Sequence, residues 1–280
     1  MDRKKYIGGS DIAAVMGVSR WKTPLQLWAE KTGEVEPEDI SSKEPVEMGI
    51  ELEETVARIW TKRTGRKVRR APKNYRHPEL GYVRCQVDRL VEGTDELLEC
   101  KTCSAWNAKE WEGEEIPTEY ILQVNWQLGI TGRRIGHIAV LIGGQKFLYK
   151  EILFDKGLFR DQVNAAVNFW TMVIDRTPPV AEAADNSFMV ELYPKAGAEI
   201  KAATQEIIDA LAMLQQTKAQ IIDLEKTKKE IEAKIKAVIG DNLGLDTPEY
   251  VVKWIPVKGS TFTVTKKDSR MLRITKKKGA

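Results

Sequence analysis

Histidine is scarce in this sequence, where only His77 and His137 occur among 280 residues. So few histidines argue against a zinc site built from several imidazoles. They also leave few candidates for the base of a Ser-His-Asp triad. Any hydrolytic chemistry in this chain would therefore have to rely on carboxylates, lysine and bound metal ions.

Cysteines and long apolar runs are equally scarce. The three cysteines, Cys85, Cys100 and Cys103, are too few for a disulfide framework. No stretch of about 18 apolar residues occurs, so no membrane span is expected. The N-terminus lacks the apolar segment of a signal peptide. We therefore expect a cytoplasmic protein that does not act at a membrane.

Charge of one sign is not in large excess either. The net charge is +3 and the isoelectric point is about 8.6. This mild basicity does not by itself indicate nucleic-acid binding, so a DNA-binding surface would need locally clustered positive charge. The length of 280 residues is enough for one full domain and an appendage, and hydrophobic residues make up 42% of the chain, so a core can form.

The first 180 residues or so alternate between helical and extended patterns. Thr23-Pro24 marks the start of a helix, with Pro24 at the first helical position. Residues 34–45 and the basic segment 66–79 are expected to be irregular. The alternation predicts an α/β domain with a mixed sheet over residues 1–179, ending near Pro178-Pro179. Helices are expected over 12–16, 24–33, 46–64, 118–130 and 155–175, and strands over 83–91, 97–102, 137–142 and 146–153.

The remaining chain has a different pattern. Apolar residues recur at heptad spacing over 199–239, which predicts either one helix of about 41 residues, roughly 60 Å long, or two shorter helices folded together. With the linker this helical segment spans 180–240, and it is expected to serve packing or oligomerisation. Residues 241–280 are expected to form a short β-rich basic tail, with strands over 250–254 and 261–265. The tail is either solvated or contacts phosphates without sequence preference.

A hairpin in the first domain carries the strongest chemical signal. If a two-residue turn is centred on Gly93-Thr94, Asp88 lies directly opposite Glu99, on one face of the pair. Lys101, two residues after Glu99, points to the same face. Two facing carboxylates beside a lysine suit a divalent cation bound by hard oxygen ligands. The alternative is an ordinary polar sheet face with one ion pair.

One glutamate on the helix before this hairpin faces inward. On a helical wheel for 46–64, Glu53 falls inside the apolar arc of Val56, Ala57 and Trp60. Glu51 and Glu54 fall with Arg58 on the opposite side. A buried carboxylate needs a partner, which is either a metal ion or a salt bridge, for example to Arg84 or Arg89.

Two glutamines lie one turn apart on the helix that follows the hairpin. Gln123 and Gln127, together with Lys101, could position a phosphate or a water molecule. The alternative is that both belong to a solvated helix face.

These residues fall within sequence motifs that occur together and in a fixed order. Residues 8–14 (GGSDIAA) and Trp21-Lys22-Thr23-Pro24 form the first motif, and residues 49–53 form a Gly-x-x-x-Glu motif. Asp88, Glu99-Cys100-Lys101 and Gln123-Val124-Asn125 follow. Over residues 6–175 the chain resembles YqaJ-like viral recombinases, the phage lambda exonuclease-like branch of the PD-(D/E)XK nucleases. It departs from the family pattern at Val87, where a proline is usual, and at Asn125, where a second glutamine is usual.

The resemblance implies a PD-(D/E)XK, restriction-endonuclease-like core, with a mixed sheet flanked by helices and a long helical segment after it. It implies one or two Mg²⁺ ions, replaceable by Mn²⁺, held by Asp88, Glu99 and the Cys100 backbone carbonyl. Glu53 would complete the site directly or through water, and Lys101 would orient or deprotonate the attacking water. Gln123 is expected to belong to the same catalytic set.

The resemblance also implies an activity and partners. We expect 5′-to-3′ degradation of linear duplex DNA, leaving 3′ overhangs for phage-type recombination by strand annealing, by a homotrimeric ring that works with a single-strand annealing protein. A 5′-terminal phosphate would need its own pocket. Ser10, at a helix start, is the best candidate for it, with Arg3, Arg20 and Gln127 as further candidates.

Three other interpretations compete with this one. Cys100-Lys101-Thr102-Cys103 is a Cys-x-x-Cys pattern, but its overlap with Glu-x-Lys on a strand argues against redox chemistry. Three cysteines cannot supply the iron–sulfur ligands of some relatives. A non-catalytic DNA-binding or scaffold protein, or a structure-specific or restriction-type endonuclease able to cut closed circles, remains an alternative.

Overall fold

The computed structural model describes residues 2–72, 74–261, 263 and 269–275. The chain divides into two compact units, Met1–Pro194 and Lys195–Ala280. Each is described by itself below.

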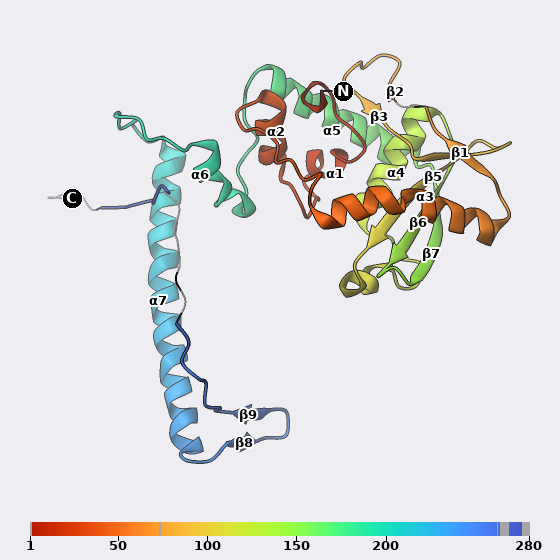
Figure 1. The fold of residues 1–280 in the computed structure, drawn as a ribbon. Coiled ribbons are helices and arrows are strands. Elements are labelled where there is room, and N and C mark those ends of the chain that lie inside the picture. Colours follow the sequence, from red (N-terminus) through yellow and green to blue (C-terminus); the bar gives the residue numbers. More distant parts are fainter. Residues whose placement is uncertain (1, 73, 262, 264–268, 276–280) are drawn as a thin grey trace. The chain divides into compact units, whose positions relative to one another are not determined.

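The first unit is built on a five-stranded mixed sheet (Figure 1). Its order is β1 (Val68–Arg70), β4 (Arg89–Val91), β5 (Glu96–Cys103), β6 (Ile135–Ile142) and β7 (Lys146–Leu153). β5 and β6 run parallel, and every other neighbouring pair is antiparallel. The parallel pair is joined by a crossover through α4 (Thr118–Thr131), as parallel neighbours require. The expected mixed sheet is thus confirmed.

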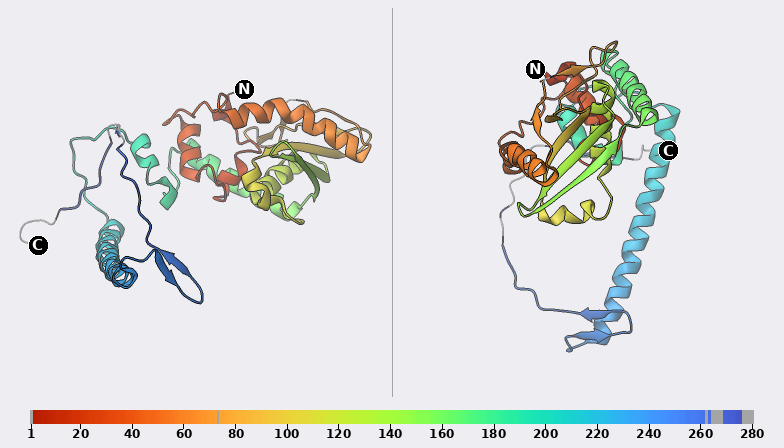
Figure 2. Two further views of the ribbon diagram at one scale, coloured as in Figure 1. Left: turned by 60° about the horizontal axis from the view of Figure 1, so that its bottom comes forward. Right: turned by 90° about the vertical axis from the view of Figure 1, so that its right-hand side faces the viewer.

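Helices cover both faces of the sheet (Figures 1 and 2). Because side chains alternate along a strand, Leu98 of β5 faces α3 (Glu44–Thr64), where it packs with Val56 and Trp60. Leu97 faces the larger cluster on the other side. That cluster includes side chains of α1 (Ile12–Val15), α2 (Pro24–Thr32), α4 and α5 (Lys156–Ile174).

The expected helix signals operate as predicted. The Thr23 side chain accepts from the backbone N–H of Gln26, and the Gln26 side chain accepts from the backbone N–H of Thr23. These two bonds form a capping box. α2 ends at Gly33 and α3 at Gly65, both in left-handed conformations that glycine adopts without strain.

Two strand expectations were wrong. The basic segment 66–79, expected to be irregular, contains β1 and β2 (Tyr75–Arg76). The single strand expected over 83–91 is divided into β3 (Arg84–Cys85), which pairs with β2, and β4, which pairs with β1 and β5. Residues 86–88 lie between the two strands, so Asp88 is not part of a strand.

α4 is seated closely against its neighbours. A Cβ atom at Gly129 would overlap the ring of Phe159 on α5, and one at Gly136 on β6 would overlap the side chain of Val124 on α4. Both positions therefore require glycine because of close approach.

The first unit extends past the boundary expected at residue 179. η3 (Ala183–Asp185) and α6 (Phe188–Leu192) belong to it. Asp185 is fully buried and accepts a 2.5 Å hydrogen bond from the Thr23 hydroxyl, and Leu192 joins the core. These contacts hold residues 180–194 to the first unit.

The second unit contains α7 (Gln205–Ile239) and a two-stranded antiparallel hairpin, β8 (Gly244–Asp246) with β9 (Val251–Lys253). α7 is one continuous helix of 35 residues, shorter than the 199–239 expected and not folded on itself. Its heptad side chains are largely exposed, including Ile207, Ile221 and Leu224. The strand expected over 261–265 and most lysines of the basic tail lie largely outside the described residues. Within the described ranges, none of the helices is both long enough and apolar enough to cross a bilayer.

Candidate active site

The observed pairing of β4 with β5 places Asp88 beside Glu99. Arg89 lies opposite Leu98, which is the register that the two-residue turn predicted. The ladder stops one residue short of Asp88, whose Oδ2 atom instead accepts a hydrogen bond from the backbone N–H of Cys100 at 2.8 Å. Asp88 thus lies against the flank of β5 directly before β4 begins at Arg89.

The same bond indicates where the Cys100 carbonyl points. In a strand, the N–H and C=O groups of one residue are directed to the same flank. Since the Cys100 N–H is directed at Asp88, its carbonyl also points past the end of β4. A backbone oxygen therefore lies on the flank that carries the Asp88 carboxylate.

The Glu99 carboxylate is buried and held by three donors. Only 3% of the residue is exposed. Oε1 accepts from Lys101 Nζ at 2.7 Å and from Gln123 Nε2 at 2.5 Å, and Oε2 accepts from Gln127 Nε2 at 2.7 Å. Gln127 also donates to the Gln86 carbonyl at 2.9 Å. These contacts fix both oxygens of Glu99 in position.

Burial and Glu99 together raise the pKa of Asp88 to about 8, while Lys101 and the Cys100 N–H oppose the shift. Two carboxylates in a poorly solvated site repel each other, so one of them retains a proton. A divalent cation would relieve this repulsion. The electrostatics of the pair thus favour a bound cation.

Lys101 lies between Glu99 and an aromatic ring. Its ammonium is 5.2 Å from the ring centroid of Tyr120, which stacks on Trp111 with 5.4 Å between centroids. Burial alone lowers the pKa of Lys101, but the charges of Glu99 and Asp88 more than offset this, and the net shift is upward. Lys101 is therefore a cation in this arrangement.

Glu53 forms a salt bridge with Arg89, which is one of the two alternatives expected for it. Its Oε1 lies 2.5 Å from the guanidinium of Arg89, whose side chain is only 4% exposed. Glu53 is only partly buried, but its charge reaches Asp88 and contributes to the raised pKa there, after burial and Glu99. Glu54 is exposed, as expected, but it also has a partner, because Arg89 donates to it at 2.9 Å.

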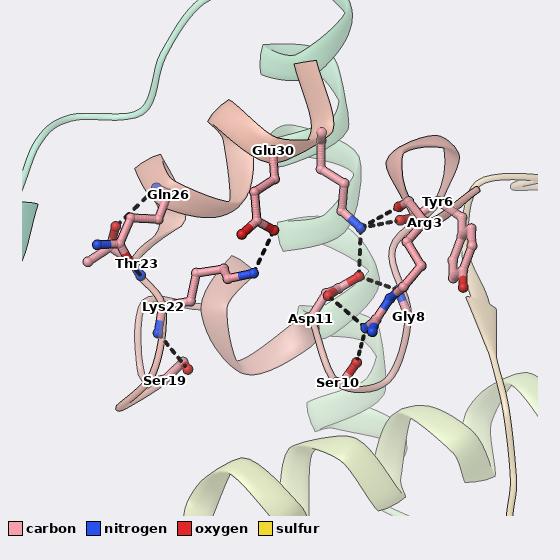
Figure 3. A network of polar contacts seen from close by, with 11 residues as sticks. Arg3, Tyr6, Gly8, Ser10, Asp11, Ser19, Lys22, Thr23, Gln26 and Glu30 are labelled. Carbon is pink, nitrogen blue, oxygen red and sulfur yellow. Dashed lines mark hydrogen bonds and ion pairs between the residues drawn. The ribbon is translucent and has the colours of Figure 1, made fainter. Parts of the chain in front are cut away.

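A cavity of about 300 Å³ opens onto the two carboxylates. Gln123, Arg3 and Ser10 line it together with Asp88 and Glu99. Arg3 donates a 2.7 Å hydrogen bond to the Ser10 hydroxyl (Figure 3). Two of the residues expected to bind a 5′-phosphate are thus brought to the carboxylates.

The other two expected phosphate ligands lie elsewhere. Arg20 forms ion pairs with Glu110 at 2.7 Å and Glu119 at 2.5 Å, and it does not line the cavity. Gln127 is 1% exposed, so its amide serves Glu99 rather than the surface. The helix that begins after Ser10 has only four residues, and Asp11 at its N-cap position makes no side-chain capping hydrogen bond. The position of Ser10, and not a helix start, therefore brings it to the site.

The glutamine motif departs from expectation in a consistent way. Asn125 faces α5, where it donates to Gln162 at 3.1 Å, and it takes no part in the site. Gln127, one turn after Gln123, binds Glu99 instead. The two glutamines are therefore one turn apart on the face of α4 directed at the carboxylates.

Two residues were missed in the sequence: Tyr120, whose ring lies against the Lys101 ammonium, and Lys31, which is buried against the segment that carries Arg3. Lys31 lies on the buried face of α2 beside Leu27 and Trp28. A lysine at an apolar position of a helical wheel was a usable signal. Tyr120, one turn before Gln123, gave no comparable signal because an aromatic residue at helical spacing usually belongs to the core.

The Cys-x-x-Cys pattern has no redox geometry. Cys100 packs with the α3 side of the sheet and Cys103 with the opposite side. Burial raises the pKa of both thiols, which disfavours the reactive thiolate.

No group of three or more His, Cys, Asp or Glu side chains converges as a preformed metal cluster within the described part of the chain. The donors available are the paired carboxylates Asp88 and Glu99 at the cavity and the Cys100 carbonyl on the same flank of β5 as Asp88. All three are hard oxygen ligands of the kind that Mg²⁺ and Mn²⁺ accept, with water completing the shell. Glu53, held by Arg89, could act on such an ion through water.

The family comparison covers the part of the chain that holds these residues. The model of the YqaJ-like viral recombinase domain matches residues 1–134, which include both carboxylates, the lysine and both glutamines. The protein YqaJ of Bacillus subtilis (strain 168) is 38% identical, over 95% of this chain and 85% of its own. This chain belongs to the YqaJ-like viral recombinase family. The expected family is thus confirmed.

Solved structures support the fold of this YqaJ-family chain. An alkaline exonuclease from Laribacter hongkongensis, LHK-Exo, aligns with a TM-score of 0.53 at 19% identity, covering 62% of this chain and 90% of its own. The same exonuclease in complex with dAMP aligns with a TM-score of 0.52 at 20% identity, over 68% and 93% of the two chains. The expected PD-(D/E)XK-type core is therefore confirmed as a fold.

Proposed function

We propose that this YqaJ-family protein is a metal-dependent exonuclease that hydrolyses phosphodiester bonds at the ends of linear double-stranded DNA. The observation that carries the proposal is the pair of carboxylates, Asp88 and Glu99, on the wall of one cavity, with the Lys101 ammonium bonded to Glu99 and the pKa of Asp88 raised mainly by burial and by Glu99.

Asp88, Glu99 and the Cys100 carbonyl would hold the metal, which we propose to be Mg²⁺, replaceable by Mn²⁺, with two ions per site. When bound, such an ion lowers the pKa of a coordinated water and stabilises the negative charge that develops on the phosphate. Gln123 and Gln127 keep Glu99 in one orientation. Residues that orient a metal ligand in this way often strongly affect the affinity for the metal. Arg89 holds Glu53 near Asp88.

Lys101 supplies positive charge at the scissile phosphate in this proposal. Its raised pKa opposes proton removal from water, so Lys101 acts as a donor to a phosphate oxygen and not as a general base. Tyr120 shields the ammonium on one side. A charged donor fixed before the reaction stabilises a transition state without reorganisation.

Arg3 and Ser10 give the site its preference for an end. Their side chains line the same cavity as the carboxylates and are bonded to each other. An arginine and a hydroxyl suit a terminal phosphate, which accepts several charge-assisted hydrogen bonds. We therefore propose recognition of the 5′-phosphate and digestion in the 5′-to-3′ direction, leaving 3′ single strands for recombination by annealing.

Assembly is proposed from family membership. A homotrimeric ring around the duplex, acting with a single-strand annealing protein, would retain DNA despite a net charge of only +3 per chain. The exposed heptad face of α7 is available for contacts with another chain or partner.

Digestion of duplex DNA labelled at either end tests the proposal. With Mg²⁺, linear DNA should lose nucleotides from its 5′ ends, more rapidly when these are phosphorylated, while closed circles stay intact. Cutting of closed circles would indicate an endonuclease. DNA binding without digestion in Mg²⁺ or Mn²⁺ would indicate a non-catalytic recombination protein.

A further inference from the structure

Lys31 is a charged side chain buried outside the catalytic set. Its side chain is 4% exposed, and its ammonium donates to the Arg3 carbonyl at 2.8 Å, the Tyr6 carbonyl at 2.7 Å and Asp11 Oδ2 at 2.8 Å. Burial lowers the pKa of Lys31, while Asp11 opposes the shift. Burying an ammonium is costly unless all its donors are used, and here all three are.

The N-terminal segment is folded around this ammonium, which bonds to Arg3, Tyr6 and Asp11. Asp11 Oδ2 also accepts from the Gly8 backbone N–H at 3.0 Å, so one carboxylate oxygen joins Lys31 to the turn before Ser10. The other oxygen, Oδ1, lies 3.7 Å from the Arg3 guanidinium. Lys31 thus fixes the Arg3 backbone directly, and it fixes the Arg3 side chain through Asp11.

The two residues presented in this way are otherwise poorly restrained. The Arg3 side chain is 65% exposed, and Ser10 is exposed as well. A long exposed side chain loses rotamer entropy when it binds a ligand, and restraint before binding reduces that loss. The contact with Asp11 and the bond to Ser10 supply such restraint.

Charge explains why the restraint uses an ion pair. Asp11 alone beside the cavity would repel a phosphate. The buried Lys31 ammonium, 2.8 Å from Asp11, offsets that negative charge, so the guanidinium of Arg3 keeps its net attraction for an anion. An apolar anchor could hold the segment but could not provide this balance.

We propose that Lys31 and Asp11 are positioning residues that present Arg3 and Ser10 to the terminal phosphate of the DNA substrate. This inference rests on the proposed recognition of a 5′-phosphate and adds to it the residues that determine end preference.

The test compares full-length wild-type protein with Lys31→Met and Asp11→Asn, which keep the size of each side chain. Lys22→Met is the matched control, because Lys22 pairs with Glu30 at 2.5 Å at the surface of the same region (Figure 3). Affinity for duplexes ending in 5′-phosphate or 5′-hydroxyl is measured by fluorescence anisotropy in EDTA, and digestion of both is measured in Mg²⁺.

Wild type and Lys22→Met should prefer the phosphorylated end by about tenfold, the effect of a charged hydrogen-bonded contact. In Lys31→Met and Asp11→Asn this preference should fall to within about twofold, while affinity for the hydroxyl end and its rate of digestion stay unchanged. Lys31→Arg, which retains the charge, should restore part of the preference.

Several results would overturn the inference. One is a wild-type preference retained in folded Lys31→Met and Asp11→Asn, and another is an equal loss on both ends, which would indicate a structural role alone. If Lys31→Met does not fold, as judged by circular dichroism, Asp11→Asn decides, because asparagine can still accept from Gly8. A wild-type protein that digests both ends equally also overturns it, but leaves the nuclease proposal intact. Absence of all digestion contradicts the nuclease proposal, and the binding preference in EDTA still judges the inference separately.

Discussion

Gln127 donates a 2.7 Å hydrogen bond to Oε2 of Glu99, the carboxylate oxygen that does not contact Lys101. The glutamine is 1% exposed and its second bond goes to the Gln86 carbonyl. Its side chain therefore holds Glu99 and the Gln86 backbone and does not reach the surface.

Replacing Gln127 by alanine should lower the affinity for Mg²⁺ without altering the residues proposed to touch metal or DNA. Residues that orient metal ligands commonly contribute about 10–100-fold to metal affinity or activity, so the Mg²⁺ concentration for half-maximal digestion should rise within that range. Asn125→Ala is the control, since Asn125 is equally buried on the same helix but faces Gln162. An equal change in Mg²⁺ requirement in both variants would show that α4 was merely destabilised.

Lys101→Ala and Asp88→Ala should retain the fold and lose nuclease activity. Asp88→Ala removes a proposed metal ligand and Lys101→Ala removes the ammonium beside Glu99, and loss of a single charge-stabilising group commonly lowers a rate by roughly 10²–10³. Circular dichroism checks the fold, and digestion of linear duplex at saturating Mg²⁺ checks the rate. Metal-dependent digestion at the wild-type rate in either variant would remove that residue from the proposed mechanism.

Three neighbouring glutamates should differ in effect although they are chemically identical. Glu53→Gln removes the carboxylate that Arg89 holds near Asp88, and it should lower the rate by about tenfold or more. Glu51→Gln, on the exposed face of α3, should change nothing. Glu54→Gln should alter stability by no more than about 1 kcal/mol, the range of an exposed ion pair. A slow Glu51 variant beside a normal Glu53 variant would refute the assignment.

Stability of the metal-free protein should fall as pH rises from about 4 to about 8. The pKa of Asp88 is raised to about 8 in the fold, mainly by burial and by Glu99, against about 3.9 in an unfolded chain. The folded state therefore binds the proton more tightly, and its stabilisation is complete below pH 4 and lost as Asp88 ionises. Melting temperatures across this range should fall for wild type and change less for Asp88→Asn.

The same proton couples metal binding to pH. Mg²⁺ must displace the proton from Asp88, so the apparent affinity should rise up to about tenfold per pH unit below pH 8. Calorimetry at pH 6, 7 and 8 measures the binding constant for Mg²⁺. A constant affinity over that range would show that Asp88 is already ionised before the metal binds.

The assembled protein should have about three times the 31.7 kDa mass of one chain. Light scattering at micromolar concentration measures this mass. The chain ending at Pro194, which lacks α7, would show whether the heptad helix is needed. A fully active monomer would contradict the ring proposal.

Local patterns predicted much of this arrangement. The turn at Gly93-Thr94 fixed the pairing that opposes Arg89 and Leu98, and thereby the position of Asp88. The helical wheel distinguished Glu53 from the exposed Glu51. Each of these inferences depends only on a period or a turn length, which residues close in sequence determine.

Contacts between distant segments were not predictable in the same way. β1 has the sequence Val-Arg-Arg, without apolar alternation, and is a strand because it pairs with β4. Residues 180–194 join the first unit through Asp185 and its bond to Thr23. The choice of Arg89 as the partner of Glu53 required the placement of α3 on the sheet, which the wheel does not supply.

Gly129 and Gly136 carry no functional group, yet the hydrogen atoms that stand in place of their side chains determine how deeply α4 can settle. Gln123 and Gln127 extend from that helix to Glu99 over bonds of 2.5 and 2.7 Å, a geometry with no slack for a shift of an ångström. A methyl group at either glycine would push the helix outward and release the carboxylate. Substitutions at these two glycines should therefore disturb the site, although neither position is proposed to contact DNA or metal.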